Sequence, residues 1–429
     1  MHPVDRPRRS FVVAVAIAGA TGLAVRILYV LLVASDAPPA GDGAYYHGLA
    51  NALADGHGFV EPLALYDGRV VATAEHPPLY PLALAFVSLI GGTGELSHRL
   101  ASCLLGASTV PLVGLAGRRL AGERAGLIAA GLAALYPMLV ILDGTLYAES
   151  LYLLLLAAVL LVALEAARRP SAGAALLLGA LIGLATLTRN EAVLLLGLLA
   201  PPALWSRGGG WRRMALATVA LVVVVAPWSA YSSVRFDALV PIATNTGVTL
   251  AGANCDTTYG DEALGQWSFQ CTSGAGGDGA ERSATLTRRG LRYAADHSGR
   301  LPAVAMVRVL RTWDLYRPWD QGAFYGLVID GRNIDMQRAG LVVLWVLLPL
   351  AAAGAFVLRR RRRELWIVAA PAIMVTLAAV LSSGSSRLRA AGELTVVLLT
   401  AVAVDAWFRR RRGSTDRQPA DIEGRTAVA

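Results

Sequence analysis

Charged residues are scarce in this chain. Only 16% of its 429 residues are charged, whereas 55% are hydrophobic and the mean hydropathy is +0.52. A soluble core cannot bury that much apolar surface, so the composition predicts a polytopic membrane protein. The 39 Lys and Arg exceed the 30 Asp and Glu, and the excess sits in short clusters between apolar runs. Such clusters are typical of cytoplasmic loops and not of a nucleic-acid surface.

Motifs for metal binding and for common hydrolase chemistry are missing as well. The sequence has no His, Cys and Asp cluster at metal-ligand spacing, no P-loop and no G-x-S-x-G elbow. We therefore expect neither a cofactor nor a metal. Of the three cysteines, Cys103 lies in an apolar run, while Cys255 and Cys271 share a polar loop. A disulfide explains this pair better than a nucleophile and a ligand do, if the loop faces an oxidising compartment.

The apolar segments divide the chain into about ten spans, because a hydrocarbon core needs roughly 20 apolar residues per helix. We place them at residues 11–34, 98–117, 124–142, 147–167, 173–188, 191–206, 214–231, 339–358, 364–381 and 394–408. The first span follows a basic start but is too long for the apolar part of a signal peptide, so we expect it to stay uncleaved.

The short run 79–91, opened by Pro77 and Pro78, decides the topology. If it crossed the membrane, the Arg clusters of every later loop would face outward. As a re-entrant or surface-lying helix, it leaves them inside with both termini. We predict an all-α, multi-pass protein of the cell membrane with cytoplasmic termini, juxtamembrane helices in the first outer loop and an extracytoplasmic active site.

This topology predicts four regions. An N-terminal transmembrane catalytic module covers residues 1–231 and includes the first outer loop, 35–97. An extracytoplasmic region, 232–338, holds Cys255 and Cys271. C-terminal transmembrane helices follow at 339–408, and residues 409–429 form a disordered cytoplasmic tail.

The first outer loop carries the strongest candidates for chemistry. Asp42 is flanked by glycines before a short helix, and is either an N-cap or a general base. Glu75 and His76 precede the double proline of the run 79–91. A helix start is a natural anion site, so His76 either packs there or binds a phosphate, with Glu75 beside the substrate.

Two further charges lie in apolar helices near the outer face. Arg99 either snorkels to the interface, pairs with an acid of the first loop, or contacts substrate. Glu149 lies one turn inside its helix, where an isolated carboxylate is costly. It either caps the helix with Asp143 or, together with Tyr147, positions an acceptor.

Arginines on the predicted outer face are stronger evidence for a binding site than Arg99 and Glu149 are, because short outer loops usually carry few arginines. Arg189 lies in one such turn, and Arg387 and Arg389 lie in another. A guanidinium binds phosphate through two parallel hydrogen bonds. We expect a phosphate-binding role for the last two, whereas Arg189 is equally well explained as an interfacial anchor.

Several segments together resemble the GT-C glycosyltransferases, closest to the branch with the protein O-mannosyltransferases and the lipid A aminoarabinose transferase. The segments are GDGAYY, LADGHGF, HPPLYP, RLASCLLGASTVPLVGLAGRRLAGERAGLIAAGLAALYP, TLYAESLY, GLATLTRNE and RLRAAGE. The resemblance covers residues 10–235 well and the C-terminal spans loosely. It implies a membrane enzyme that takes a sugar from a polyprenyl-phosphate carrier on the extracytoplasmic side, without a nucleotide sugar and usually without a metal.

The resemblance also implies roles for individual residues. An acid of the first outer loop serves the family as catalytic base or acceptor-orienting group, which carries over to Asp42. The element before the double proline helps to bind the carrier phosphate, which carries over to His76. A luminal acid of the family matches Glu149, and an outer Arg pair matches Arg387 and Arg389 as phosphate ligands.

The chain departs from the family pattern in two places. Relatives often have a second acid beside the base, but this chain has Gly43, so it stays open whether Glu75 or Glu149 assists Asp42. The soluble C-terminal domain of some relatives is not seen, and we expect the disulfide-closed loop in 232–338 to take its place.

The predicted reaction moves mannose or a pentose to a hydroxyl of an envelope glycan, lipid or protein acceptor. It would invert the anomeric centre, since no covalent nucleophile stands opposite Asp42. The alternative is a transporter or flippase for lipid-linked sugars or solutes. Such proteins place charges near the midplane and often contain inverted repeats, whereas here the charges lie at the outer rim and no repeat is visible. A non-catalytic scaffold would require Asp42 to be dispensable.

Overall fold

The computed structural model describes residues 7–34, 38–205, 209–260, 263–321 and 330–415. Within these ranges all regular elements are helices, and the one β contact is an isolated bridge between Val60 and Ala72, which confirms the predicted all-α class. The helix α19 (Ala390–Thr415) continues past residue 409, so residues 409–415 are helical and do not belong to a disordered tail. Residues 416–429 of that tail lie outside the described residues.

Seven described helices are long and apolar enough to cross a membrane. They are α1 (Arg9–Tyr29, continued as a π-helix to Ala34), α5 (Glu95–Ala121), α8 (Glu149–Arg168), α11 (Gly210–Arg235), α17 (Ile334–Leu358), α18 (Arg362–Leu381) and α19. The pair α6 (Glu123–Leu135) and α7 (Pro137–Gly144) makes an eighth candidate, bent by 46°. The predicted spans 173–188 and 191–206 do form helices, α9 (Ala172–Thr186) and α10 (Leu194–Leu204), but both are shorter than a full span.

The bend between α6 and α7 has a clear cause in the sequence. Pro137 has no N–H, so the carbonyl of Ala133 loses its helical partner. The Arg26 guanidinium of α1 donates to the carbonyls of Ala133 and Ala134, 3.2 and 3.0 Å away. Its charge is balanced by Asp143 of α7 at 2.6 Å, and both side chains are at most 2% exposed. This buried pair therefore fixes α7, and with it the loop that leads to α8.

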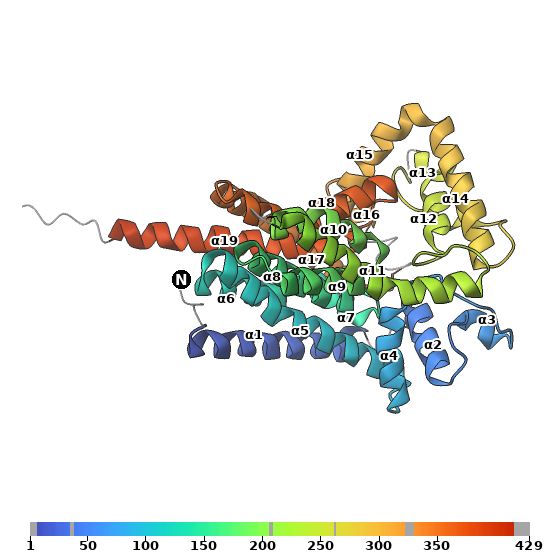
Figure 1. Cartoon of the computed structure of the whole chain (residues 1–429), viewed down its shortest axis with the longest axis horizontal. Helices are drawn as coiled ribbons and strands as arrows, with labels where there is room; N and C mark the ends of the chain where they lie inside the picture. The colour runs from blue at the N-terminus through green and yellow to red at the C-terminus, as the bar shows by residue number, and fades with distance from the viewer. Residues whose placement is uncertain (1–6, 35–37, 206–208, 261–262, 322–329, 416–429) are drawn as a thin grey trace, which may run out of the picture.

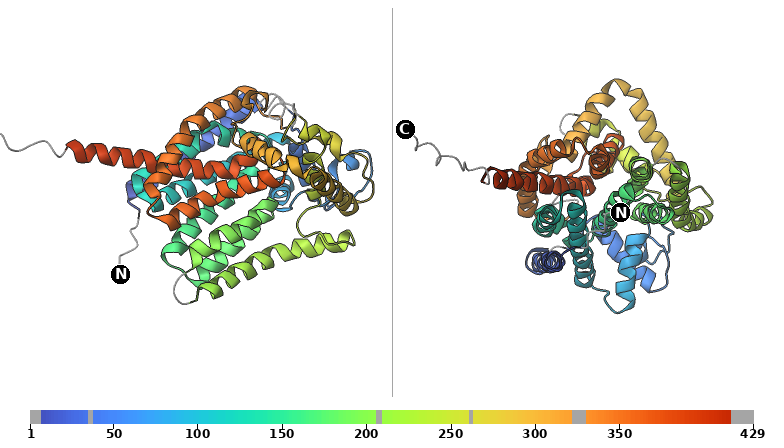
Figure 2. Two further views of the ribbon diagram at one scale, coloured as in Figure 1. Left: turned by 90° about the horizontal axis from the view of Figure 1, so that it is seen from above. Right: turned by 60° about the vertical axis from the view of Figure 1, so that its left-hand side comes forward.

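Short helices gather at one end of the bundle, which we call the loop end (residues 38–94, 236–260 and 263–321). Figure 1 shows α2 (Asp42–Ala54), α3 (Pro62–Tyr66) and α4 (Leu79–Leu89) there, next to α12 (Thr246–Ala253), α13 (Asp256–Tyr259), α14 (Gly279–Asp296), α15 (Leu301–Thr312) and α16 (Pro318–Gln321). The N-terminal end of α1 and the far end of α19 lie at the opposite end of the bundle, as Figure 1 and the left view of Figure 2 show.

At that opposite end, arginines from different parts of the chain bind neighbouring helices. Arg361, between α17 and α18, donates to the carbonyl of Leu120 at 2.6 Å. Arg119 pairs with Glu165 at 3.2 Å. The clusters that were assigned to one side of the membrane thus lie together at one end. Their assignment to the cytoplasm stays a prediction.

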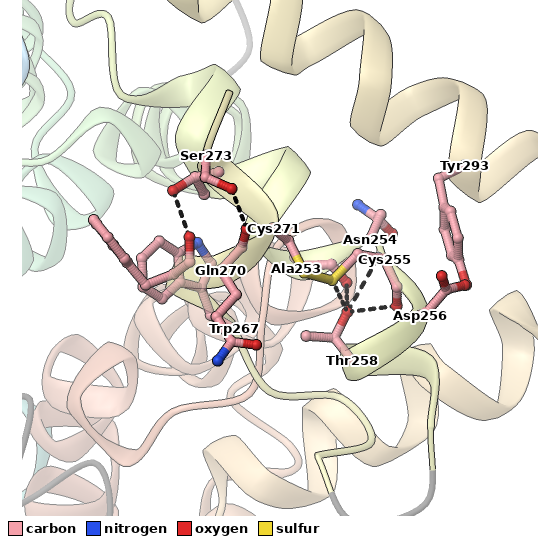
Figure 3. The surroundings of a disulfide bond; sticks show 12 residues. Ala253, Asn254, Cys255, Asp256, Thr258, Trp267, Gln270, Cys271, Ser273 and Tyr293 are labelled. Carbon is pink, nitrogen blue, oxygen red and sulfur yellow. Dashed lines mark hydrogen bonds between the residues drawn. A yellow bond between two sulfur atoms is a disulfide. The ribbon is translucent and has the colours of Figure 1, made fainter. Parts of the chain in front are cut away.

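A disulfide joins Cys255 and Cys271 in the loop end, with their Cα atoms 6.3 Å apart (Figure 3). Tyr293 of α14 donates a hydrogen bond to Asp256 at 2.8 Å, so the helix is tied to the same small unit. Arg308 of α15 bonds Asn254 at 3.0 Å and the carbonyl of Val380 of α18 at 3.2 Å. The disulfide-closed unit is therefore anchored on the helix bundle.

Candidate functional site

Six connections between helices meet where the loop end joins the bundle. They are the start of α2, the segment before α4, the turn between α7 and α8, the turn after α9, the segment before α17, and the short 3₁₀ helix Ser386–Arg389 before α19. Each connection contributes a charged side chain, and the resulting ion pairs join segments up to 345 residues apart in sequence. We call the group the charge cluster; its members are Asp42, His76, Tyr147, Glu149, Arg189, Glu191, Asp330, Arg332 and Arg387.

Arg387 is the centre of the charge cluster. Its Nη2 donates to Asp42 Oδ2 at 2.7 Å, and its Nε donates to Glu149 Oε1 at 2.7 Å. Its Nη1 lies 3.6 Å from Asp330 Oδ1. The guanidinium carbon lies 3.8 Å from the ring centre of Tyr147, a cation–π contact that fixes the plane of the group.

Glu149 holds a second guanidinium as well. Its Oε1 accepts from Arg189 Nη1 at 2.6 Å, while Arg189 Nε donates to Glu191 at 2.6 Å. Glu149 is 1% exposed, and among the described residues its Oε2 has no hydrogen-bond partner. The carboxylate of Glu149 therefore acts as a buried bridge that aligns Arg189 and Arg387.

Asp42 faces both Arg387 and an imidazole. Its Oδ1 lies 3.7 Å from His76 Nε2, and its side chain is 32% exposed. The rings of Tyr45 and Tyr46 pack against His76, with centroids 4.9 and 5.1 Å away. Partial enclosure would raise the pKa of Asp42, but Arg387 and then His76 outweigh it and hold this pKa below its usual range.

The backbone explains why Asp42 has these partners. Gly41, not Asp42, is the N-cap of α2 and has a φ of 52°, which suits glycine. The Asp42 carboxylate bonds Arg387 and not the first amides, so the N-cap alternative does not hold. At Gly43 any Cβ would overlap the carbonyl of Thr145 and touch the Tyr147 ring. The position where relatives often carry a second acid therefore has no room for a side chain here.

Of the nine residues predicted for catalysis or substrate binding, six lie in the charge cluster. They are Asp42, His76, Tyr147, Glu149, Arg189 and Arg387. Glu75 stands apart from it: its amide donates to Thr73 Oγ1, and its charge contributes to raising the pKa of nearby Glu61. No described ion pair links Glu75 to the cluster.

Two predicted arginines serve other parts of the fold. Arg389 is fully buried and pairs with Glu393 at 2.6 Å and with Asp314 at 2.7 Å, away from Arg387. Arg99 is 4% exposed, donates to the carbonyl of Ala34 at the end of the first span, and lies 3.8 Å from Glu95. For Arg99 the partner is an acid of the first outer loop, which was one of its three predicted alternatives. The phosphate contact expected for Arg389 stays a prediction.

Three cluster members were missed from the sequence. Asp330 accepts from Tyr147 at 3.2 Å and from Arg332 at 2.7 Å, and Arg332 also donates to Gln337 at 2.8 Å. Glu191 pairs with Arg189 across a single residue. One sequence signal could have found all three residues. In each pair, an acid and an arginine lie two residues apart on the predicted outer face, just before or just after a predicted span.

The chemistry of the cluster is that of an anion site with a base beside it. Four carboxylates (Asp42, Glu149, Glu191, Asp330) face three guanidiniums (Arg189, Arg332, Arg387). Within the described ranges no three His, Cys, Asp or Glu side chains are placed to hold a metal ion. An aligned pair of guanidiniums favours a phosphate or another planar or tetrahedral oxyanion.

Comparison with known proteins supports this view of the fold. Residues 75–231 match the family model described as dolichyl-phosphate-mannose-protein mannosyltransferase. No curated protein sequence matches the chain. Among solved structures, the chain is similar to the archaeal oligosaccharyltransferase AglB from Archaeoglobus fulgidus in complex with an inhibitory peptide and a dolichol-phosphate. That match has 14% identity, a TM-score of 0.55, and coverage of 98% of this chain and 53% of that chain.

Two other structures are also similar. The Archaeoglobus fulgidus oligosaccharyltransferase tethered with an acceptor peptide matches with 14% identity and a TM-score of 0.57, over 96% of this chain and 51% of that one. ArnT from Cupriavidus metallidurans bound to undecaprenyl phosphate matches with 18% identity and a TM-score of 0.44, over 94% and 79%. The chain spans about half the length of the oligosaccharyltransferase chains that it matches. This chain therefore has the GT-C fold of membrane glycosyltransferases, with a protein mannosyltransferase family match over residues 75–231.

Proposed function

We propose that the chain is a membrane glycosyltransferase that moves a sugar from a polyprenyl-phosphate carrier to a hydroxyl acceptor outside the cytoplasm. The observation that carries the proposal is the triad of Asp42, Arg387 and Glu149, with His76 beside it, where the loop end meets the bundle. One partly exposed carboxylate lies next to two aligned guanidiniums. A transfer from a phosphate carrier needs these two elements, a base and a phosphate site.

The reaction follows from the chemistry of these groups. The Asp42 carboxylate takes the proton of the acceptor hydroxyl as the acceptor oxygen attacks the anomeric carbon. The bond between that carbon and the carrier phosphate oxygen breaks, and its electron pair leaves with the phosphate. Arg387, Arg189 and His76 stabilise the departing negative charge. Direct displacement of this kind inverts the anomeric centre.

Glu149 is assigned a positioning role in this scheme. Its side chain is 1% exposed and its Oε1 already bridges Arg189 and Arg387 at 2.6 and 2.7 Å. At 1% exposure this carboxylate is closed to an acceptor hydroxyl. Asp42, at 32% exposure, is the accessible base.

A transfer assay tests the proposal. The purified chain in proteoliposomes is given a panel of radiolabelled polyprenyl-phosphate sugars, mannose and pentoses first, with envelope glycans, lipids and proteins as acceptors. We expect label to move from carrier to acceptor with one of these donors. Movement of intact labelled carrier between leaflets, without transfer to any acceptor, supports the lipid flippase instead and contradicts the proposal.

A further inference from the structure

Every nitrogen of Arg387 faces a carboxylate. Nε bonds Glu149, Nη2 bonds Asp42 at 2.7 Å, and Nη1 lies 3.6 Å from Asp330. One face of the guanidinium is covered by Tyr147. A phosphate that binds this arginine through two parallel hydrogen bonds therefore lies against a carboxylate that is already there, and the two anions repel each other unless the carboxylate moves.

The three carboxylates differ in how firmly they are held. Glu149 is 1% exposed and also binds Arg189. Asp330 is 5% exposed and also binds Arg332 and Tyr147. Asp42 is 32% exposed, and its other oxygen lies 3.7 Å from an imidazole. Displacing Glu149 or Asp330 would leave a buried charge in an altered environment, which is costly, whereas Asp42 can turn toward His76 and solvent.

We propose that the donor phosphate takes the place of Asp42 on the Nη edge of Arg387, and that this exchange releases the Asp42 carboxylate to the acceptor hydroxyl. The inference rests on the proposed function. It makes Asp42 both the base and the occupant of the phosphate site in the absence of donor. Donor binding then precedes activation of the base, so an acceptor is deprotonated only when a leaving group is in place.

Charge balance in the cluster supports an exchange over a simple addition. Four carboxylates already face three guanidiniums, so an added phosphate would meet a surplus of negative charge if none moved away. Exchange keeps Nη2 of Arg387 paired with one anion throughout, first Asp42 and then the phosphate. The separated Asp42 keeps a hydrogen-bond partner within reach in His76.

The exchange predicts that removing the Asp42 charge strengthens carrier binding. The experiment measures the binding of a polyprenyl monophosphate without sugar to the full chain in nanodiscs, for wild type, Asp42→Asn and Asp67→Asn. The Asp67 variant is the matched control, because it removes one carboxylate of the same loop, which is 71% exposed and pairs with Arg69 and not with the charge cluster. We expect Asp42→Asn to bind about tenfold more tightly than wild type, and Asp67→Asn to differ by less than about threefold.

Several results overturn the inference. Carrier binding to Asp42→Asn that equals wild type or is weaker shows that Asp42 does not occupy the phosphate site. An equal gain in both variants shows a general effect of charge and no exchange. Asp42→Ser gives a second measurement if the Asn variant does not fold. Sugar transfer by wild type is scored separately, so tighter binding without transfer supports the exchange while contradicting the proposed enzyme.

Discussion

Arg387 and Arg389 lie only two residues apart but have different surroundings. Arg387 is 13% exposed and reaches Asp42 and Glu149 from other segments, whereas Arg389 is fully buried between Glu393 and Asp314. The 3₁₀ helix Ser386–Arg389 separates them, because i and i+2 side chains of such a helix point to different sides. One arginine is therefore available to a ligand and the other anchors the segment that presents it.

Substituting each arginine by lysine separates these roles. Lysine keeps the charge but loses the planar pair of donors. We expect Arg387→Lys to lower the rate of sugar transfer by about 10² or more with little change in thermal stability. Arg389→Lys is expected to lower the free energy of unfolding by about 1–3 kcal/mol, with transfer by the folded protein within about threefold of wild type. Equal losses of transfer in both variants would contradict the division of roles.

Glu61, in the first loop, gives a pH-dependent prediction. Burial, and then the charge of Glu75, raise its pKa from 4.5 to about 6. Between pH 4.5 and about pH 6, Glu61 is protonated in the folded protein but ionised in the unfolded chain. The contribution of Glu61 to the free energy of unfolding therefore falls as the pH rises through this range. Glu61→Gln should therefore stabilise the protein at pH 8 relative to wild type, by at most about 1 kcal/mol after solvent screening, and not at pH 5.

The measurement is the melting temperature of both proteins at pH 5 and pH 8. The exposed Asp67→Asn variant, from the same loop, is the control and should show no such pH-dependent difference. A gain for Glu61→Gln that is the same at both pH values would mean that ionisation of Glu61 does not cause it.

At the scale of helices, the feature that shapes the site is the break between α6 and α7. Pro137 ends α6, and Arg26 and Asp143 hold the broken ends against α1. The turn after α7 contains buried Leu146 with a φ of 59°, a strained value for leucine, and then delivers Tyr147 and Glu149. The buried pair stabilises a turn that the chain would not adopt by itself.

Asp143→Asn tests this support. The change leaves the Arg26 guanidinium buried without its counter-ion, so we expect a loss of about 3–5 kcal/mol in the free energy of unfolding. Glu165→Gln is the comparison, because Glu165 is 39% exposed in its pair with Arg119 and should cost at most about 1 kcal/mol. Unfolding of both variants in detergent with increasing denaturant gives the two values. A cost for Asp143→Asn no greater than that for Glu165→Gln would show that the pair does not hold the break.

At the scale of the whole molecule, the bundle and the loop end are linked through α15, which carries the disulfide-closed unit onto α18. The disulfide spans 16 residues of sequence, a loop length for which cross-linking is worth about 3 kcal/mol against local unfolding. We expect the double variant Cys255→Ser, Cys271→Ser to be cut by protease between these positions much faster than wild type under non-reducing conditions. The bundle should keep its melting temperature, and an unchanged cutting rate would contradict a stabilising role.

Much of the fold could be predicted, because each membrane span is encoded by a run of apolar residues that are neighbours in the sequence. Each of the ten predicted segments is helical, and only the length criterion sets α9 and α10 apart. The site was harder, since the pairs of Arg387 join residues 345 and 238 positions apart, which no local pattern encodes. Placing polar residues on one predicted face recovered Asp42, Glu149 and Arg387. It missed Asp330, whose local signal is only an Arg two residues away just before a span. It included Arg389, whose burial depends on residues at the end of α15.

The single-turnover rate of sugar transfer at saturating donor, measured for wild type and Asp42→Asn, tests whether Asp42 is the base. The pairing of Asp42 with Arg387 predicts that the variant still binds the polyprenyl-phosphate carrier, while its transfer rate falls by about 10³ or more because the base is gone. Transfer by Asp42→Asn at the wild-type rate would show that the base lies elsewhere, and the assignment of the active site to the charge cluster would be wrong.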